Sequence, residues 1–305
     1  MKRRILSLVL AIAVCTSLGV TATAAYETDT GVETTSGLNL EPKSEYQMAL
    51  EETQRTRARM GTKTPLEEYK EAFDVRARMD ADTLRSMGYS EEEIAILQEY
   101  NDGNCSFEEA ATKASAVLTP SVSSSMHTGE KYSVTYSWEW DRIPTGLGQD
   151  GFAMGLCGID DQSMGFITKV DIFTASVTYY YTDNVKYKSE SPEKTITTSG
   201  VSAKFQSYKM DDARDRWVFA KKGTMTAIIT PAVTGKTKFA AVRVVGGYGH
   251  SSTTRTKINV SVKVDVKSGD VTTTFTVSSS SSGTVTTYGK KQVIFYNDGS
   301  KFVEV

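Results

Sequence analysis

Cysteine, histidine and proline are scarce in this 305-residue chain, which has 3 Cys, 2 His and 6 Pro. So few cysteines exclude a disulfide-dense scaffold, and no Cys-x-x-Cys pair or histidine cluster is present to hold a metal ion. With 23 Gly and 39% hydrophobic residues, the chain is neither collagen-like nor wholly disordered. The length is sufficient for one or two domains with an apolar core.

The first apolar run has the three parts of a secretory signal peptide. Basic residues at 2–4 precede the apolar stretch 5–14, and the small residues at 21–25 supply a cleavage site. A membrane-spanning helix needs about 20 apolar residues, whereas this run is shorter and is followed by polar residues. We therefore expect cleavage after Ala24 or Ala25 and a secreted or cell-surface location.

The spacing of the apolar residues changes near residue 119. Residues 26–40 are rich in Thr and Gly with little periodicity, which predicts a flexible leader. From 41 to 118, capping-box Ser and Thr residues and Gly stops predict a small helical domain. Its helices are expected at about 43–60, 65–79, 81–87, 91–100 and 107–117.

From about residue 130 the apolar residues alternate with polar ones, as in strands with one buried face. The stretches 132–140 and 257–267 show this most clearly, and the turn residues 297–299 predict a final hairpin. Further strands are expected at 151–157, 170–181, 201–208, 224–230, 238–245 and 271–277. The predicted fold class is α+β, with a small N-terminal helical domain followed by an antiparallel β-sandwich or open barrel over 119–305.

The net charge of -2 is an average over unlike segments. Residues 26–118 hold 10 basic and 20 acidic residues, whereas 119–305 hold 22 basic and 17 acidic ones. The expected helical domain is therefore acidic and the β domain basic, which supports the boundary. We expect the basic part to attach to an anionic surface in a salt-sensitive way, while the acidic helices stay solvated or fold back onto it.

After the signal peptide, the remaining cysteines are Cys105 and Cys157. In an exported chain they are either one disulfide, joining the helical segment to the β segment, or two reduced thiols. The sequence leaves both alternatives open.

The segment 81–117 carries a Met-Gly-Tyr loop at Met87, Gly88 and Tyr89, followed by a Gly-Asn turn before its last helix. It resembles a ubiquitin-associated-like three-helix module. In that family the loop forms part of the ligand surface, and the resemblance carries this role over to the same three residues. A helix stop followed by a capping box produces much of the pattern, so a purely structural similarity is the alternative.

Aromatic side chains offer a candidate binding surface. Trp138 and Trp140 share one face of the predicted 132–140 strand, where they form either a platform for sugar rings or part of the core. Tyr180 is a third candidate, because alternation exposes at least one residue of 179–181.

The Tyr-Ser-Trp-x-Trp pattern at 136–140, together with the signal peptide and the Ser/Thr-rich strands, resembles a group of exported proteins from Gram-positive bacteria. The resemblance implies export and a β domain, and it supplies no active-site residues.

Three functions follow from these features. The leading one is an exported non-catalytic protein whose β domain binds an anionic cell-wall polymer, a glycan or a membrane surface. The second is a β-type pore-forming protein that uses the Ser/Thr-rich hairpin 256–288. The third is a hydrolase that pairs His250 with Cys157 or a Ser, oriented by Asp160 or Asp161. No catalytic, metal or cofactor motif stands out, and scattered basic residues argue against nucleic acid.

Overall fold

The computed structural model describes residues 34–56, 63–127, 130–233, 235, 238–253, 256–265, 270–278, 283–288, 292–298 and 300–304. The predicted signal peptide and residues 26–33 of the predicted leader lie outside this part of the chain. Within it, helices and antiparallel strands are combined, so the predicted α+β class with antiparallel strands is confirmed.

The helices begin close to where their capping residues predict. Their bounds are α1 (Glu45–Arg55), α2 (Pro65–Ala77), α3 (Ala81–Ser86), α4 (Glu91–Asn101) and α5 (Phe107–Ala114). Ser44, Thr64 and Ser90 each form a complete capping box. Helix α1 begins two residues later than expected, because β2 (Lys43–Ser44) pairs with the following β segment. We call residues 45–114 the helical unit.

Most strands belong to two antiparallel sheets. Sheet A has the order β1-β3-β4-β12-β7-β8, and sheet B has the order β18-β17-β13-β5-β10-β9. The strands of sheet A are β1 (Thr34–Asn39), β3 (Val117–His127), β4 (Lys131–Trp140), β12 (Arg216–Pro231), β7 (Thr168–Tyr181) and β8 (Lys186–Glu190), with β2 and β11 (Tyr208–Asp211) at its margins. Those of sheet B are β18 (Lys301–Glu304), β17 (Gln292–Tyr296), β13 (Ala241–Ser251), β5 (Gln149–Ile159), β10 (Gly200–Gln206) and β9 (Glu193–Thr197), with β6 (Gly165–Phe166) and β16 (Val285–Tyr288) beside them.

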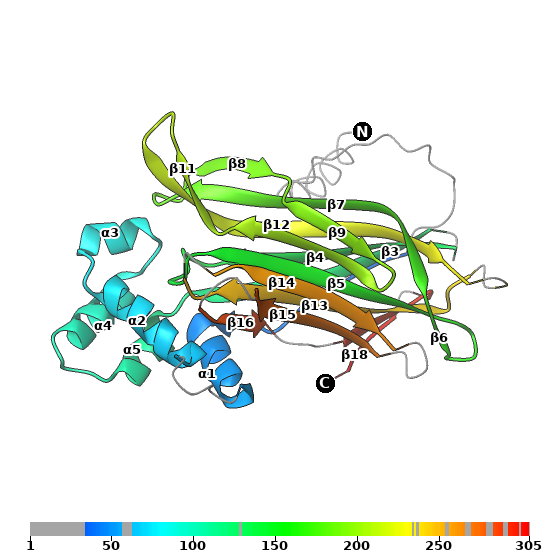
Figure 1. Ribbon diagram of the computed structural model, residues 1–305, viewed down its shortest axis with the longest axis horizontal. Helices are drawn as coiled ribbons and strands as arrows, with labels where there is room; N and C mark the ends of the chain where they lie inside the picture. Colours follow the sequence, from blue (N-terminus) through cyan, green and yellow to red (C-terminus); the bar gives the residue numbers. More distant parts are fainter. Residues whose placement is uncertain are drawn as a thin grey trace, which may run out of the picture. The chain divides into compact units, whose positions relative to one another are not determined.

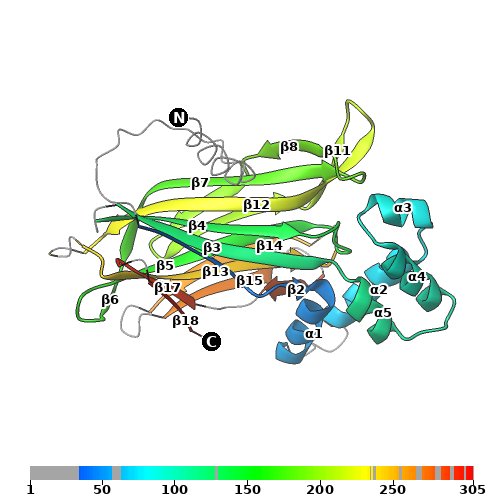
Figure 2. The same cartoon turned by 180° about the vertical axis from the view of Figure 1, so that it is seen from behind.

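The two sheets face each other across one hydrophobic core (Figure 1). Trp138 of sheet A stacks on Phe205 of sheet B at 5.3 Å and meets Phe152 edge-on at 5.9 Å. The five helices lie at one end of the sheets, as Figure 2 shows from behind. We call the strands of sheets A and B, with their connecting loops, the β part.

The helical unit has a core of its own, built around rings of α2 and α5. Phe73 lies 5.7 Å from both Tyr100 and Phe107, and Leu97 is fully buried beside them. Helix α1 also contributes Met48 to the core between the sheets, so it is packed on two sides. Among the described helices, none is both long and apolar enough to cross a membrane.

The flexible leader predicted over 26–40 is wrong for residues 34–39. This stretch is β1, paired along its length with β3 from Thr34 opposite Met126 to Asn39 opposite Ser121. An edge strand is held mainly by backbone hydrogen bonds, so it needs few apolar side chains and leaves a weak sequence signal.

The hairpin predicted over 256–288 does not include residues 285–288. β15 (Val271–Val277) pairs with β14 (Ile258–Val264) in a separate two-stranded sheet, whereas β16 pairs with β13. The final hairpin predicted at 297–299 is present as β17 and β18.

Candidate functional site

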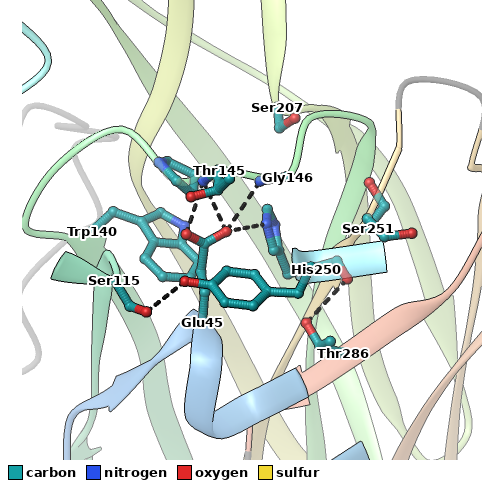
Figure 3. A network of polar contacts seen from close by, with 12 residues as sticks. Glu45, Ser115, Trp140, Thr145, Gly146, Ser207, His250, Ser251 and Thr286 are labelled. Atoms are coloured by element: carbon teal, nitrogen blue, oxygen red, sulfur yellow. Dashed lines mark hydrogen bonds and ion pairs between the residues drawn. The ribbon is translucent and has the colours of Figure 1, made fainter. Parts of the chain in front are cut away.

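A buried network of charged side chains joins the helical unit to sheet B (Figure 3). His250 of β13 lies between two carboxylates. Its Nδ1 is 2.9 Å from Asp150 Oδ2, and its Nε2 is 3.1 Å from Glu45 Oε1. Asp150 is on β5, and Glu45 is the first residue of α1. All three side chains are at most 5% exposed, so the network is closed to bulk solvent.

Neutral donors complete the coordination of both carboxylates. The backbone N–H groups of 145–146 donate to Glu45 at 2.8–3.1 Å. The Tyr248 hydroxyl donates to Asp150 at 2.6 Å, and the Ser251 N–H does so at 2.9 Å. Buried carboxylates require this number of donors, because burial removes their hydration.

Electrostatics within the network favour the charged forms. Burial alone would lower the pKa of His250, but the charges and hydrogen bonds of Asp150 and Glu45 raise it to about 10. Burial alone would raise the pKa of Glu45, but the hydrogen bond and charge of His250 hold it below its ordinary value. His250 is therefore a cation at neutral pH with both ring nitrogens engaged, which suits it to joining elements rather than to accepting a proton.

The structure does not bring Cys157 and His250 together. Cys157 is on the same strand as Asp150 but seven residues further along, which is about 23 Å in an extended strand. Its thiol contacts the Phe166 carbonyl at 3.6 Å, and burial raises its pKa. Asp160 accepts hydrogen bonds from backbone N–H groups of its own turn, 162–164. The pairing of Cys157 with His250 is therefore wrong.

The two cysteines are free thiols. Cys105 is half-buried in the helical unit, where its Sγ lies 3.7 Å from the Ile96 carbonyl, whereas Cys157 is buried in β5. Of the two alternatives left open by the sequence, the structure has the reduced pair and not the disulfide.

Trp138 and Trp140 are core residues, so their assignment as a binding platform is wrong. They are 1% and 0% exposed, because their face of β4 is covered by sheet B. The Trp140 indole N–H donates to the Tyr248 hydroxyl at 3.3 Å, beside the charged network. Tyr180 is half-buried, with the Lys221 and Lys222 ammonium groups 5.9 and 5.6 Å from its ring.

The Met-Gly-Tyr loop contacts the β part. Tyr89 is buried, and the Arg142 guanidinium lies 5.1 Å from its ring centroid. The Met87 carbonyl accepts the Ile143 N–H at 3.3 Å. Helices α3, α4 and α5 do occupy 81–117. The ligand surface implied by the ubiquitin-associated resemblance is in this chain a contact between the helical unit and the β part.

An aromatic pair, the exposed Trp217 and the half-buried Tyr208, lies on the β11–β12 hairpin. Trp217 is 48% exposed, and its ring is 5.3 Å from that of Tyr208. In the hairpin register Trp217 is opposite Met210, and Tyr208 is opposite Phe219. These side chains therefore share one face of the hairpin, and the exposed end of that face presents an aromatic platform.

The opposite face of this hairpin is fixed by polar contacts to β7 and to the turn that follows it. Asp211 accepts the Tyr181 hydroxyl at 2.6 Å, and Arg216 pairs with Asp183 at 2.7 Å. The Arg216 guanidinium also lies 4.4 Å from the Tyr181 ring. The platform is consequently held in a defined orientation, which lowers the entropy lost when it binds a ligand.

Sequence reasoning missed this platform, because the charged residues 211–216 are typical of a solvated loop or short helix. The available signal is the alternation on both sides of that segment, Tyr208 with Met210 and Trp217 with Phe219.

No nearby residue pattern indicates that Glu45 and Asp150 are the partners of His250. Within the described part of the chain, no group of His, Cys, Asp and Glu side chains has the arrangement of a metal site.

Comparison with known proteins supplies distant likenesses in structure. No family model matches the chain, and no curated protein matches it. Clostridium perfringens delta-toxin is similar over 63% of this chain and 89% of its own, with 7% identity and a TM-score of 0.27. A structure titled "pH-induced modulation of Streptococcus parasanguinis adhesion by Fap1 fimbriae" is similar over 55% of this chain and 78% of its own, with 10% identity and a TM-score of 0.24. A third, titled "AvmM Catalyzes Macrocyclization in Alchivemycin A Biosynthesis", covers 48% of this chain and 79% of its own, with 10% identity and a TM-score of 0.18. Likenesses at this level carry no argument about function.

Proposed function

We propose that the chain is an exported, non-catalytic protein, a small helical domain followed by an antiparallel β-sandwich, that associates with a glycan-bearing cell surface through the β11–β12 hairpin. The observation that carries the proposal is the exposed Trp217 side chain beside the half-buried Tyr208 ring. Trp and Tyr side chains held rigidly with one ring face in solvent are the residue types that most often act as binding hot spots.

A sugar is the ligand class that this platform suits. The flat faces of indole and phenol rings pack against the C–H face of a pyranose, and Trp and Tyr are frequent binding hot spots. The basic composition of 119–305 favours a glycan that also carries negative charge.

The test is co-sedimentation of the protein with Gram-positive cell-wall preparations, before and after removal of the anionic wall polymers. Trp217→Ala should weaken binding about tenfold or more, as expected for a hot-spot aromatic. The matched control is Tyr296→Ala, because Tyr296 is another exposed aromatic, at 41%, on a different strand. Equal binding by the Trp217 variant and the wild type would overturn the assignment of the site, and binding to no glycan preparation would overturn the function.

Tryptophan fluorescence gives a second readout. The chain has 3 Trp, and Trp138 and Trp140 are buried in the core. A shift in emission or protection from acrylamide on adding the glycan therefore reports on Trp217. A salt titration then separates the two contributions, since charge pairing weakens with ionic strength and ring stacking does not.

A further inference from the structure

The β14–β15 hairpin is built differently from the other strands. Among the described strands these two form a sheet of their own, with Ile258 opposite Val277 and Val264 opposite Val271. The hairpin lies over β5 and β13 of sheet B (Figure 1) and contacts them through side chains. It is attached to the β part at its two ends, by side-chain packing on one face, and by an ion pair of Arg243 with Asp270, just before β15, at 4.0 Å.

The two faces of the hairpin differ in polarity. The face toward sheet B is apolar except for the buried Thr273, and Ile258, Val262, Val271 and Phe275 on it are buried. The opposite face is polar and exposed; its residues are Lys257, Asn259, Ser261, Lys263, Asp265, Thr272, Thr274 and Thr276. This alternation is what a hairpin needs if it lines an aqueous pore on one side and contacts lipid on the other.

The surface beneath the hairpin consists largely of backbone. Gly151 and Gly155 of β5, with Gly247 and Gly249 of β13, lie where a Cβ would collide with hairpin side chains. A Cβ at Gly249, for example, would be 2.5 Å from the Phe275 ring. Between these glycines, the hairpin covers the apolar side chains of Ala153, Cys157, Val245 and Val285. If the hairpin leaves, these four side chains are uncovered, and the larger Ile, Val and Phe side chains of the hairpin need a new apolar environment.

A single carboxylate of the helical unit holds both ends of the hairpin segment. Glu68 of α2 accepts hydrogen bonds from the Ser252 hydroxyl, the Thr284 hydroxyl at 2.7 Å and the Thr284 N–H at 2.8 Å. Ser252 follows β13 and Thr284 precedes β16, and the Ser252 N–H donates to the Thr284 carbonyl at 3.1 Å. We call Ser252 and Thr284 the hairpin roots.

We propose that the β14–β15 hairpin lifts off sheet B and inserts into a lipid bilayer, and that Glu68 retains it at its roots until then. The alternating pattern runs through 256–265 and 270–278, close to the roughly 9–11 residues with which a strand crosses a bilayer. Because strand edges cannot stay unpaired in lipid, hairpins from several copies must close into one barrel. The inference goes beyond the glycan site and does not depend on it.

The first test locks the hairpin to sheet B with a disulfide. A Cβ placed on Gly155 would be 3.7 Å from Val271 Cβ, within the range that a disulfide requires. Gly155→Cys with Val271→Cys is made in the chain from Tyr26 onward, with Cys105 and Cys157 replaced by Ser and Ala. Vesicles of phosphatidylcholine and phosphatidylglycerol loaded with calcein are the probe. We expect the oxidised protein to release no dye and the reduced protein to release it like its parent.

The second test measures which face of the inserted hairpin contacts lipid, and it does not require the disulfide variant to fold. A fluorophore on Val264→Cys, which points toward sheet B, should be quenched by nitroxide-labelled lipid once the hairpin inserts. The same fluorophore on Lys263→Cys, on the exposed face, should not be quenched. Glu68→Gln should speed dye release severalfold, whereas Glu71→Gln, an exposed carboxylate on the same helix, should not.

Three results would overturn the proposal. These are dye release by the oxidised, locked protein, equal lipid quenching at 263 and 264, and no release by the wild type or the Glu68 variant at micromolar concentration. A hairpin that instead exchanges between copies would give dimers without lipid and no quenching at 264, which also counts against insertion. Binding of the glycan in the same preparations is measured separately, so either function can fail alone.

Discussion

Replacing His250 by glutamine should be among the most damaging single changes in this protein. The substitution removes the cation between Glu45 and Asp150 and leaves both carboxylates buried. At an effective dielectric constant of about 20, each contact near 3 Å contributes roughly 5 kcal/mol of attraction before the cost of dehydration is subtracted. Since removing one partner of a buried ion pair typically costs about 3–5 kcal/mol, we expect His250→Gln to lower the free energy of unfolding by that amount.

The assay is urea unfolding followed by tryptophan fluorescence, because the Trp140 ring lies 5.4 Å from the His250 ring. The matched control is Lys63→Gln, which breaks an ion pair with Glu71 whose side chains are 55% and 58% exposed. That control should unfold at the same urea concentration as the wild type. In a double variant, Glu45→Gln with His250→Gln, the free energy of unfolding should fall by less than the sum of the two single decreases. The reason is that the double variant removes one of the two carboxylates that would otherwise be buried without a cation.

The dependence on pH tests the same reasoning through its sign. The pKa of His250 is raised from 6.5 to about 10 by its carboxylate neighbours, so its contribution to stability is full below pH 6.5 and disappears as the pH rises through about 10. The pKa of Glu45 is lowered from 4.5, so its contribution is full above pH 4.5 and is lost in more acidic solution. The difference between wild type and His250→Gln should therefore be largest near pH 5.5. A loss under about 1 kcal/mol at that pH, or a difference that grows toward pH 10, would refute the network as a stabilising element.

Two further predictions concern the core and the surface beneath the hairpin. Trp138→Ala should cost about 3–5 kcal/mol in unfolding followed by circular dichroism, because the ring is 1% exposed and stacks on Phe205; a loss under 1 kcal/mol would contradict its place in the core. Gly249→Ala should cost about 1–3 kcal/mol and make 256–278 more sensitive to protease, because its Cβ would press on the Phe275 ring; an unchanged cleavage rate would contradict the close packing described here.

Local chemistry explains why the helices and many strands could be predicted from the sequence. All the residues that define the start of α2 lie within its first turn. Thr64 is the N-cap, Pro65 is at the first position, and the Glu67 carboxylate accepts the Thr64 N–H at 2.7 Å. β4 and β15 likewise follow from alternation within a single stretch. Such signals need only neighbours in sequence, so they survive without knowledge of the fold.

Alternation identifies the two faces of a strand but does not say what covers them. This is why Trp138 was predicted either as core or as a platform, and why the structure was needed to decide between them. The same ambiguity applies to Trp217 of β12. Its side chain is exposed, whereas the side chain of the next residue, Val218, is buried. The position of a strand in the sheet order decides burial, and that order depends on pairings between distant segments.

The partners in the charged network could not be predicted from the sequence. His250 meets Asp150 across 100 residues and Glu45 across 205. No motif predicts such a set, because its members come from three elements that have no fixed spacing. Acidic residues are common in the first turn of a helix, and Glu45 is one of them. It is a buried ion only because β13 packs against the start of α1.

The charge difference between the acidic helical unit and the basic β part corresponds to direct contacts between them. Four carboxylates of the helical unit, among those described, reach the β part: Glu45 at His250, Glu52 at Thr287, Glu68 at the hairpin roots and Glu93 at Arg142. The acidic helices therefore fold back onto the β part, and some of its basic charge is used there. Because His250 is two residues before Ser252, the contact that stabilises the joint and the contact that retains the hairpin share one short segment of β13 and its continuation. Weakening the His250 network should consequently loosen the hairpin roots as well.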